Sequence, residues 1–157
     1  MKEFDYCSAG LYFITFCTKH RAKVLSKIVG GGALDAPEII LSPMGRIVKK
    51  YLISTNNINN GSVLSYVIMP DHVHMVVGIE KIFGTSKAPS PTNETIPHVI
   101  STLKRFANRD IGKDIFQRSY YDHIIRNDFD LKETLDYITQ NPYLWFEGKR
   151  GDTKFLR

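Results

Sequence analysis

The sequence is compatible with an α+β domain, an antiparallel sheet with helices packed on it, and three observations support this class. Runs rich in β-branched and aromatic residues at 11–18, 62–69 and 72–79 are typical of strands. The last two runs flank Pro70-Asp71, a tight-turn dipeptide, so they form an antiparallel hairpin. Three further segments repeat apolar residues at helical spacing, and the order of strands and helices is compatible with helices packed on the sheet.

The first half of the chain supplies one further strand and one helix. After the strand at 11–18, a glycine- and proline-containing connection leads to a short edge strand at 38–41. Ser42 is a good N-cap and Pro43 suits the first helical position, so we expect a helix from residue 43. Its apolar stripe contains Ile47 and Tyr51.

The second half begins with a mobile loop at 84–95 and a helix at 96–109. Thr95 is the expected cap of this helix, and Pro97 falls in its first turn. The run YYDHII, within residues 115–127, predicts a short strand or extended segment.

A third helix is expected at about 129–141. Either Asp128 or Asp130 would cap it, and Pro142 would stop it.

His72 and His74 are the first candidate site. Side chains alternate along a strand, so both imidazoles point to one face, while Val73 and Met75 point to the other. Two imidazoles at this spacing can reach one metal ion, given at least one more ligand. The same spacing also suits two ordinary surface or hydrogen-bonded core histidines, and the pair alone leaves both alternatives open.

Tyr137 and Asn141 are the second candidate site. Leu131, Leu135 and Ile138 form the apolar face of the third helix, and Tyr137 lies about 100° away from that face. Asn141 is four residues further on and therefore on the same side as Tyr137. The helix offers a phenol and an amide together, although a surface tyrosine in water fits the pattern as well.

Composition indicates an anionic partner and no membrane. The chain of 157 residues has a net charge of +5, which favours nucleic acid as the partner. Basic residues at 19–23, 46–50 and 104–109 are either solvated faces or phosphate contacts. The two cysteines, Cys7 and Cys17, fit no Cys-x-x-Cys pattern. Neither a signal peptide nor an apolar span is visible, so we expect a soluble cytoplasmic protein.

Three blocks follow one another in the chain: VIMPDHVHMVV, QRSYYDHIIR and LDYITQNPYLW. Together they resemble the single-tyrosine HUH transposases of the insertion-sequence type, and most closely the REP-associated tyrosine transposases. HUH denotes histidine, hydrophobic residue, histidine, here His72-Val73-His74. The resemblance extends from the first strand to Trp145. It departs from the family at Phe116-Gln117, where Trp-Gln is common and one aromatic replaces another.

This resemblance implies a fold, a metal and a nucleophile. The fold is ferredoxin-like or RNA-recognition-motif-like, an HUH nuclease fold spanning residues 1–157 as one domain. His72, His74 and Asn141 match the residues that hold a divalent metal, usually Mg or Mn. Tyr137 matches the catalytic tyrosine, ahead of Tyr120 and Tyr121.

The resemblance also implies partners and a location. Single-stranded or hairpin DNA is the expected substrate, and the protein is expected in the cytoplasm with the nucleoid. Some relatives are dimers that exchange the tyrosine helix and others act as monomers, so a homodimer is one of two expected states. His123 orients a ligand, contacts DNA or is structural. The expected DNA-binding residues are Lys19, Arg21, Lys104, Arg105, Arg118 and Arg126.

The implied reaction is DNA cleavage and strand transfer through a 5′-phosphotyrosine, as in transposition or in the processing of repeated hairpin elements. A binding module of the same fold that holds hairpin nucleic acid without cutting it is the main alternative. A zinc hydrolase using the two histidines is less favoured, because no further His or Cys ligand set and no neighbouring glutamate base accompany them.

Overall fold

The computed structural model describes residues 10–30, 36–55, 61–79 and 96–148. Four strands form an antiparallel sheet in the order β4-β5-β1-β6, and a second sheet pairs β2 with β3. The strands are β1 (Gly10–Cys17), β2 (Ser26–Val29), β3 (Glu38–Leu41), β4 (Gly61–Ile68), β5 (His72–Ile79) and β6 (Tyr121–Ile125). The helices are α1 (Pro43–Ser54), α2 (Ile96–Ile111) and α3 (Asp128–Phe146). The predicted α+β class with an antiparallel sheet is therefore confirmed.

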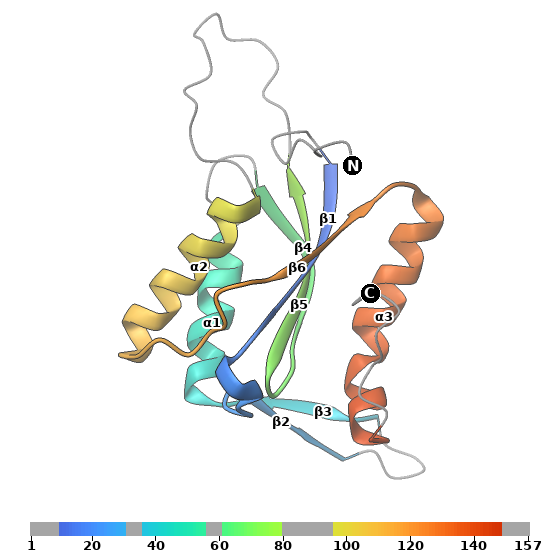
Figure 1. The fold of residues 1–157 in the computed structure, drawn as a ribbon. Helices are drawn as coiled ribbons and strands as arrows, with labels where there is room; N and C mark the ends of the chain where they lie inside the picture. The colour runs from blue at the N-terminus through green and yellow to red at the C-terminus, as the bar shows by residue number, and fades with distance from the viewer. Residues whose placement is uncertain (1–9, 31–35, 56–60, 80–95, 149–157) are drawn as a thin grey trace, which may run out of the picture.

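Helices cover both faces of the four-stranded sheet. Figure 1 shows α1 and α2 on one side of the sheet and α3 on the other. The larger core cluster lies under α1 and α2 and includes Val48 and Leu103. The smaller cluster lies under α3 and includes Phe13 and Ile138. Because the sheet is enclosed on both faces, a polar group on β1 or β5 must find its partners inside the protein.

Strand β5 is buried along its whole length. Val73, Met75 and Val77 belong to the cluster under α1 and α2, whereas Val76 belongs to the cluster under α3. This alternation confirms the prediction that His72 and His74 share one face of the strand, and that face is the one under α3. In β1 the antiparallel partner of His74 is Thr15, and the partner of His72 is Cys17.

Helix α1 begins where the sequence predicted. Ser42 accepts a hydrogen bond from the Gly45 amide, and Pro43 occupies the first helical position. The Ser42 hydroxyl also donates to the carbonyl of Val24, which ties the helix start to the segment before β2. Gly45 lies against that segment, since a Cβ there would come within 2.0 Å of the Leu25 carbonyl oxygen.

Helix α3 differs from the prediction at both ends. Its N-cap is Asn127, whose side chain accepts from the Asp130 amide, so the expected caps Asp128 and Asp130 were wrong. The Asp130 carboxylate is engaged by His123 and the Arg126 amide. The expected stop at Pro142 was also wrong, because the helix continues to Phe146. A proline inside a helix costs about 3 kcal/mol, and the packing of Trp145 beyond it offsets that cost.

Other expectations have mixed outcomes. The edge strand at 38–41 is confirmed and pairs with β2, a strand the sequence did not predict. The extended segment YYDHII is confirmed as β6.

The expected loop at 84–95, the Thr95 cap and Cys7 lie outside the described residues. Among the described helices, none is both long and apolar enough to cross a membrane.

Candidate metal and nucleophile site

The two histidines face each other at the start of β5, an interior strand of the sheet. Their Nε2 atoms are 3.1 Å apart and their ring centroids 4.6 Å apart, with the ring planes at 72°. Two nitrogen ligands that bind one ion at about 2.1 Å and at right angles are about 3 Å apart. The observed separation of the Nε2 atoms therefore suits two neighbouring ligands of one cation.

The other nitrogen of each ring lies against an oxygen. Nδ1 of His72 is 2.6 Å from Asp71 Oδ1, and Nδ1 of His74 is 2.6 Å from Thr15 Oγ1. A metal-binding histidine commonly donates its second N–H to an oxygen in this way, which fixes the ring orientation and presents the other nitrogen to the ion. These roles of Asp71 and Thr15 were not predicted from the sequence. Thr15 could be found only through the pairing of β1 with β5.

Burial sets the charge of His74. His74 is 2% exposed, and burial lowers its pKa well below the usual value, with the charges of His72 and Arg21 acting in the same direction. His74 is consequently neutral at neutral pH. Neutral imidazole is the form that binds a metal.

Helix α3 brings the predicted tyrosine to this pair within one chain. The Tyr137 ring lies 5.2 Å from the His74 ring, centroid to centroid, and packs edge-on against Phe13. Two turns later, Trp145 lies 6.1 Å from the His72 ring. Tyr137, Asn141 and Trp145 recur every four residues and so lie on one side of the helix. Tyr137 is half-buried, so the prediction that it stands off the packed face was wrong.

Asn141 lies between these two contacts along the helix and is 2% exposed. Its Nδ2 atom is buried without a hydrogen-bond partner among the residues that the structure describes. A buried amide atom without a partner costs free energy, and the two ends of an amide are interchangeable by a flip. After such a flip, the buried position that lacks a partner is occupied by the amide oxygen, which is suited to bind a cation. The donor set of two imidazoles and one amide therefore fits a divalent cation.

No group of three His, Cys, Asp or Glu side chains within the described parts of the chain is placed to hold a metal. Within these described parts, a third protein ligand beside His72 and His74 is therefore of another type, as an amide is. Tyr121 shares the face of the histidine pair, since it pairs with Thr15 across β1, but it is separated from β5 by that strand. Tyr120 packs in the other cluster, under α1 and α2.

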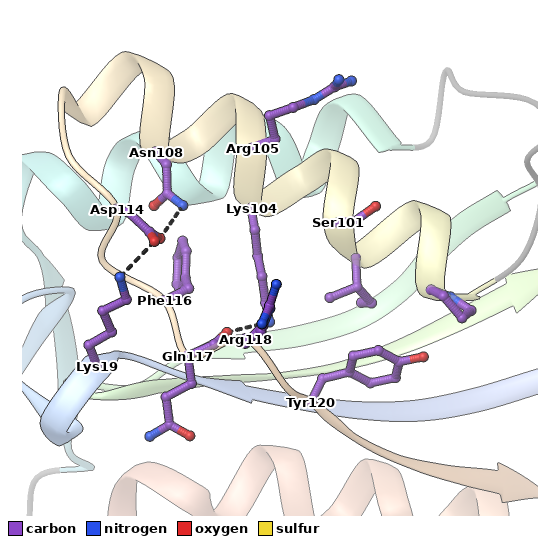
Figure 2. Close-up of a pocket in the computed structure, with 12 residues that line it drawn as sticks. Lys19, Ser101, Lys104, Arg105, Asn108, Asp114, Phe116, Gln117, Arg118 and Tyr120 are labelled. Atoms are coloured by element: carbon purple, nitrogen blue, oxygen red, sulfur yellow. Dashed lines mark hydrogen bonds and ion pairs between the residues drawn. The ribbon is translucent and has the colours of Figure 1, made fainter.

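Four of the six predicted DNA-binding residues line one groove. The groove, of about 890 Å³, lies between α2 and the segment 116–120 and contains Lys19, Lys104, Arg105 and Arg118. Figure 2 shows Lys19 paired with Asp114, while Arg105 points outward from α2. The apolar floor includes Phe116, which belongs to the cluster under α1 and α2. The groove is therefore on the opposite face of the sheet from the histidine pair.

Lys104 differs from a solvated basic residue. It is 9% exposed, and its ammonium donates to the carbonyl of Gln117 at 2.8 Å (Figure 2) and to that of Ser119 at 3.0 Å. Burial lowers its pKa. The interpretation of Lys104 as part of a solvated helix face was wrong, because the segment after α2 folds over its side chain.

The two remaining predicted DNA contacts lie elsewhere. Arg21 pairs with Asp71, with Nε 3.2 Å from Oδ2. Arg126 is exposed at the end of β6. His123 lies 2.9 Å from an oxygen of Asp130, a contact that ties β6 to α3.

Comparison with known proteins identifies the family. The family model described as "Transposase IS200 like" matches residues 7–141. A putative REP-associated tyrosine transposase of Haemophilus influenzae is 25% identical, with 88% of this chain and 73% of that protein covered. An uncharacterised protein of the same organism is 28% identical, with 92% and 87% covered.

Two solved structures share the fold. A REP-associated tyrosine transposase bound to a REP hairpin has a TM-score of 0.65 and 19% identity, with 95% of this chain and 76% of that chain covered. A putative transposase from Deinococcus radiodurans has a TM-score of 0.50 and 16% identity, with 95% and 97% covered. The chain is a transposase, and it belongs to the IS200-like transposase family. The resemblance to REP-associated tyrosine transposases is confirmed.

Proposed function

We propose that this transposase cleaves and rejoins single-stranded DNA through a covalent bond to Tyr137. The observation that carries the proposal is the packing of the Tyr137 ring against His74, whose Nε2 converges with that of His72. His72, His74 and Asn141 would hold the divalent cation, Mg or Mn. The bound cation would neutralise charge on the scissile phosphate and polarise its phosphorus.

The chain's own part in the reaction is nucleophilic attack. The Tyr137 oxygen forms a bond to phosphorus, its proton passes to solvent, and the bond from phosphorus to the 3′-oxygen breaks. The products are a 5′-phosphotyrosine and a 3′-hydroxyl, which gains a proton. Attack by another 3′-hydroxyl reverses the step and joins two strands. Each step exchanges one phosphate ester for another, so no nucleotide cofactor is needed.

Hairpin DNA is the proposed substrate. A structural neighbour is bound to a REP hairpin, and this chain carries a net charge of +5. We propose that Lys19, Arg105 and Arg118 contact phosphates from the groove, with Arg126 at the sheet edge. Measurements on variants of Lys104 and Arg21 decide whether these two residues also contact DNA phosphates. The proposed cellular location is the cytoplasm, with the nucleoid.

The test uses single-stranded oligonucleotides that carry a hairpin, labelled at either end and incubated with the protein and Mn²⁺. A 3′ label is expected to migrate with the protein in denaturing detergent, because the downstream fragment stays on Tyr137. A 5′ label is expected to appear on a shorter free fragment that ends in a 3′-hydroxyl. Tyr137→Phe should abolish both signals and leave DNA binding unchanged.

Tyr143→Phe is the matched control, since Tyr143 lies on the same helix and is half exposed. It should retain the adduct. Hairpin binding without any adduct in the wild-type protein would instead support a binding module that does not cut. An adduct that persists in Tyr137→Phe would assign the nucleophile to another residue, with Tyr121 the first to test.

A further inference from the structure

The carboxylate of Asp71 is fully buried between a histidine and an arginine. Its Oδ1 is 2.6 Å from Nδ1 of His72, and its Oδ2 is 3.2 Å from Nε of Arg21. Each carboxylate oxygen therefore has a separate cationic or N–H partner. A buried carboxylate is tolerated only with such partners, so the three side chains form one unit.

The backbone around Asp71 is fixed by the segment that follows β1. The amide and the hydroxyl of Thr18 both donate to the Asp71 carbonyl, at 3.0 and 3.1 Å. The Leu25 amide donates to the Pro70 carbonyl at 3.0 Å. Asp71 thus occupies a turn that is clamped from outside the β4–β5 hairpin, and its carboxylate has little freedom to move away from His72.

Arg21 lies on the same clamping segment in an uncommon backbone conformation. Its φ is 53°, and that of His20 is 55°, both in the left-handed region that non-glycine residues rarely adopt. The guanidinium forms an ion pair with Asp71 and donates a hydrogen bond, from its Nη1, to the sulfur of Cys17 at 2.6 Å. Two consecutive residues are strained, and the strain is held by contacts that aim Arg21 at the buried carboxylate.

We propose that Asp71 and Arg21 are positioning residues for His72. Asp71 holds the proton on Nδ1 of His72 and so leaves the Nε2 lone pair facing His74, and Arg21 holds the carboxylate in place. The effect of Asp71 on metal binding rests on the proposed function. The position of the proton on His72 does not, because it is a property of the metal-free protein. It assigns to Arg21 a partner inside the protein in place of the DNA phosphate expected from the sequence.

The first measurement is the tautomer of His72 in the full-length, metal-free protein, from long-range proton–nitrogen NMR with ¹⁵N-histidine. The expected result is one tautomer protonated at Nδ1. In Asp71→Asn the amide can donate to Nδ1, so the Nε2-protonated tautomer should become populated. A wild-type His72 that is protonated at Nε2 would overturn the proposal without any variant.

The second measurement is Mn²⁺ affinity by electron paramagnetic resonance. Loss of the oxygen partner of a metal-binding histidine typically weakens binding 10- to 100-fold, and we expect about that loss in Asp71→Asn. Arg21→Gln should weaken Mn²⁺ binding in the same direction by a smaller factor. Asp136→Asn is the control, since it removes an exposed carboxylate that pairs with Lys132, and it should leave both readouts unchanged.

The outcomes separate the proposal from the proposed function. Failure of the wild type to bind Mn²⁺ would remove the metal site, while the tautomer of His72 would still test the role of Asp71. Folded Asp71→Asn with unchanged tautomer and Mn²⁺ affinity would refute that role. If Arg21→Gln weakens only DNA binding and its salt dependence, Arg21 is a phosphate contact and not a positioning residue. Should Asp71→Asn fail to fold, the wild-type tautomer and Arg21→Gln still decide.

Discussion

At the scale of single residues, the burial of a side chain determines its role in stability or binding more than its residue type does. Lys104 illustrates this, because its ammonium is one of several basic groups on α2 but lies beneath a folded segment. Lys104→Met leaves the carbonyls of Gln117 and Ser119 without their donor. A hydrogen bond from a charged group contributes about 1.5–3 kcal/mol; because Gln117 is half-buried and Ser119 exposed, water can replace part of it, and we expect a loss near the lower end of that range in the free energy of unfolding, measured in urea.

Arg105→Gln is the matched control for Lys104, since the neighbouring Arg105 side chain is exposed. Its free energy of unfolding should change by less than about 0.5 kcal/mol. In hairpin-binding assays at fixed salt, Lys104→Met should weaken binding less than Arg118→Gln does. Equal losses of affinity, with unchanged stability in Lys104→Met, would return Lys104 to the set of phosphate contacts.

His74 makes stability depend on pH. Burial lowers its pKa in the folded protein, so below pH 6.5 the unfolded chain binds a proton that the folded chain does not. Stability from this group is complete above about pH 6.5 and falls as the pH drops toward the folded-state pKa. The slope is about 1.4 kcal/mol per pH unit for one proton.

The measurement is urea unfolding of the metal-free protein between pH 7.5 and pH 5, compared with His74→Gln. The difference between the two slopes isolates this group from the carboxylates, which titrate in both proteins. We expect the variant to be less sensitive to pH over this range. Identical slopes would mean that the folded protein protonates His74 as readily as the unfolded chain does.

At the scale of elements, the features that depend on local sequence spacing could be predicted, whereas those that depend on long-range contacts could not. Alternation along β5 placed both histidines on one face, and the spacing of Tyr137 and Asn141 placed both on one side of α3. Thr15 and Asp71 were missed because their roles depend on which strands pair and on where the 18–25 segment packs. The continuation of α3 past Pro142 was missed because tertiary packing outweighs a local helix breaker.

The start of α3 gives a test at this scale. Asn127→Ala removes the side-chain acceptor for the Asp130 amide, and such a loss typically costs about 1 kcal/mol. Asp128→Ala removes the charge and the side-chain oxygens of Asp128 from the first turn and should cost only a few tenths of a kcal/mol. Thermal unfolding of both variants compares them directly. A larger loss of stability in Asp128→Ala than in Asn127→Ala would restore Asp128 as the cap.

At the scale of the whole molecule, the basic groove and the histidine pair lie on opposite faces of the sheet. Charge in the groove should then affect binding of DNA and leave the cleavage step of bound DNA unchanged. Arg118→Gln should reduce the slope of the logarithm of affinity against the logarithm of salt concentration by about 0.7–0.9. The cleavage rate at saturating DNA should equal that of wild type.

Lys132→Gln is the control, because Lys132 lies on the exposed surface of α3 in a pair with Asp136. Its salt slope should match that of wild type. A drop in the rate at saturating DNA in Arg118→Gln would mean that the groove acts on the chemistry as well as on affinity.

The position of β6 at the edge of the sheet has a consequence for substrate geometry. On the proposed function, we expect a nucleic acid that occupies both faces to pass around this outermost strand, because the exposed Arg126 lies at its end. The thickness of the protein at that edge would then determine the length of DNA between the hairpin duplex and the cleaved phosphodiester bond. This length would not depend on which bases the DNA contains.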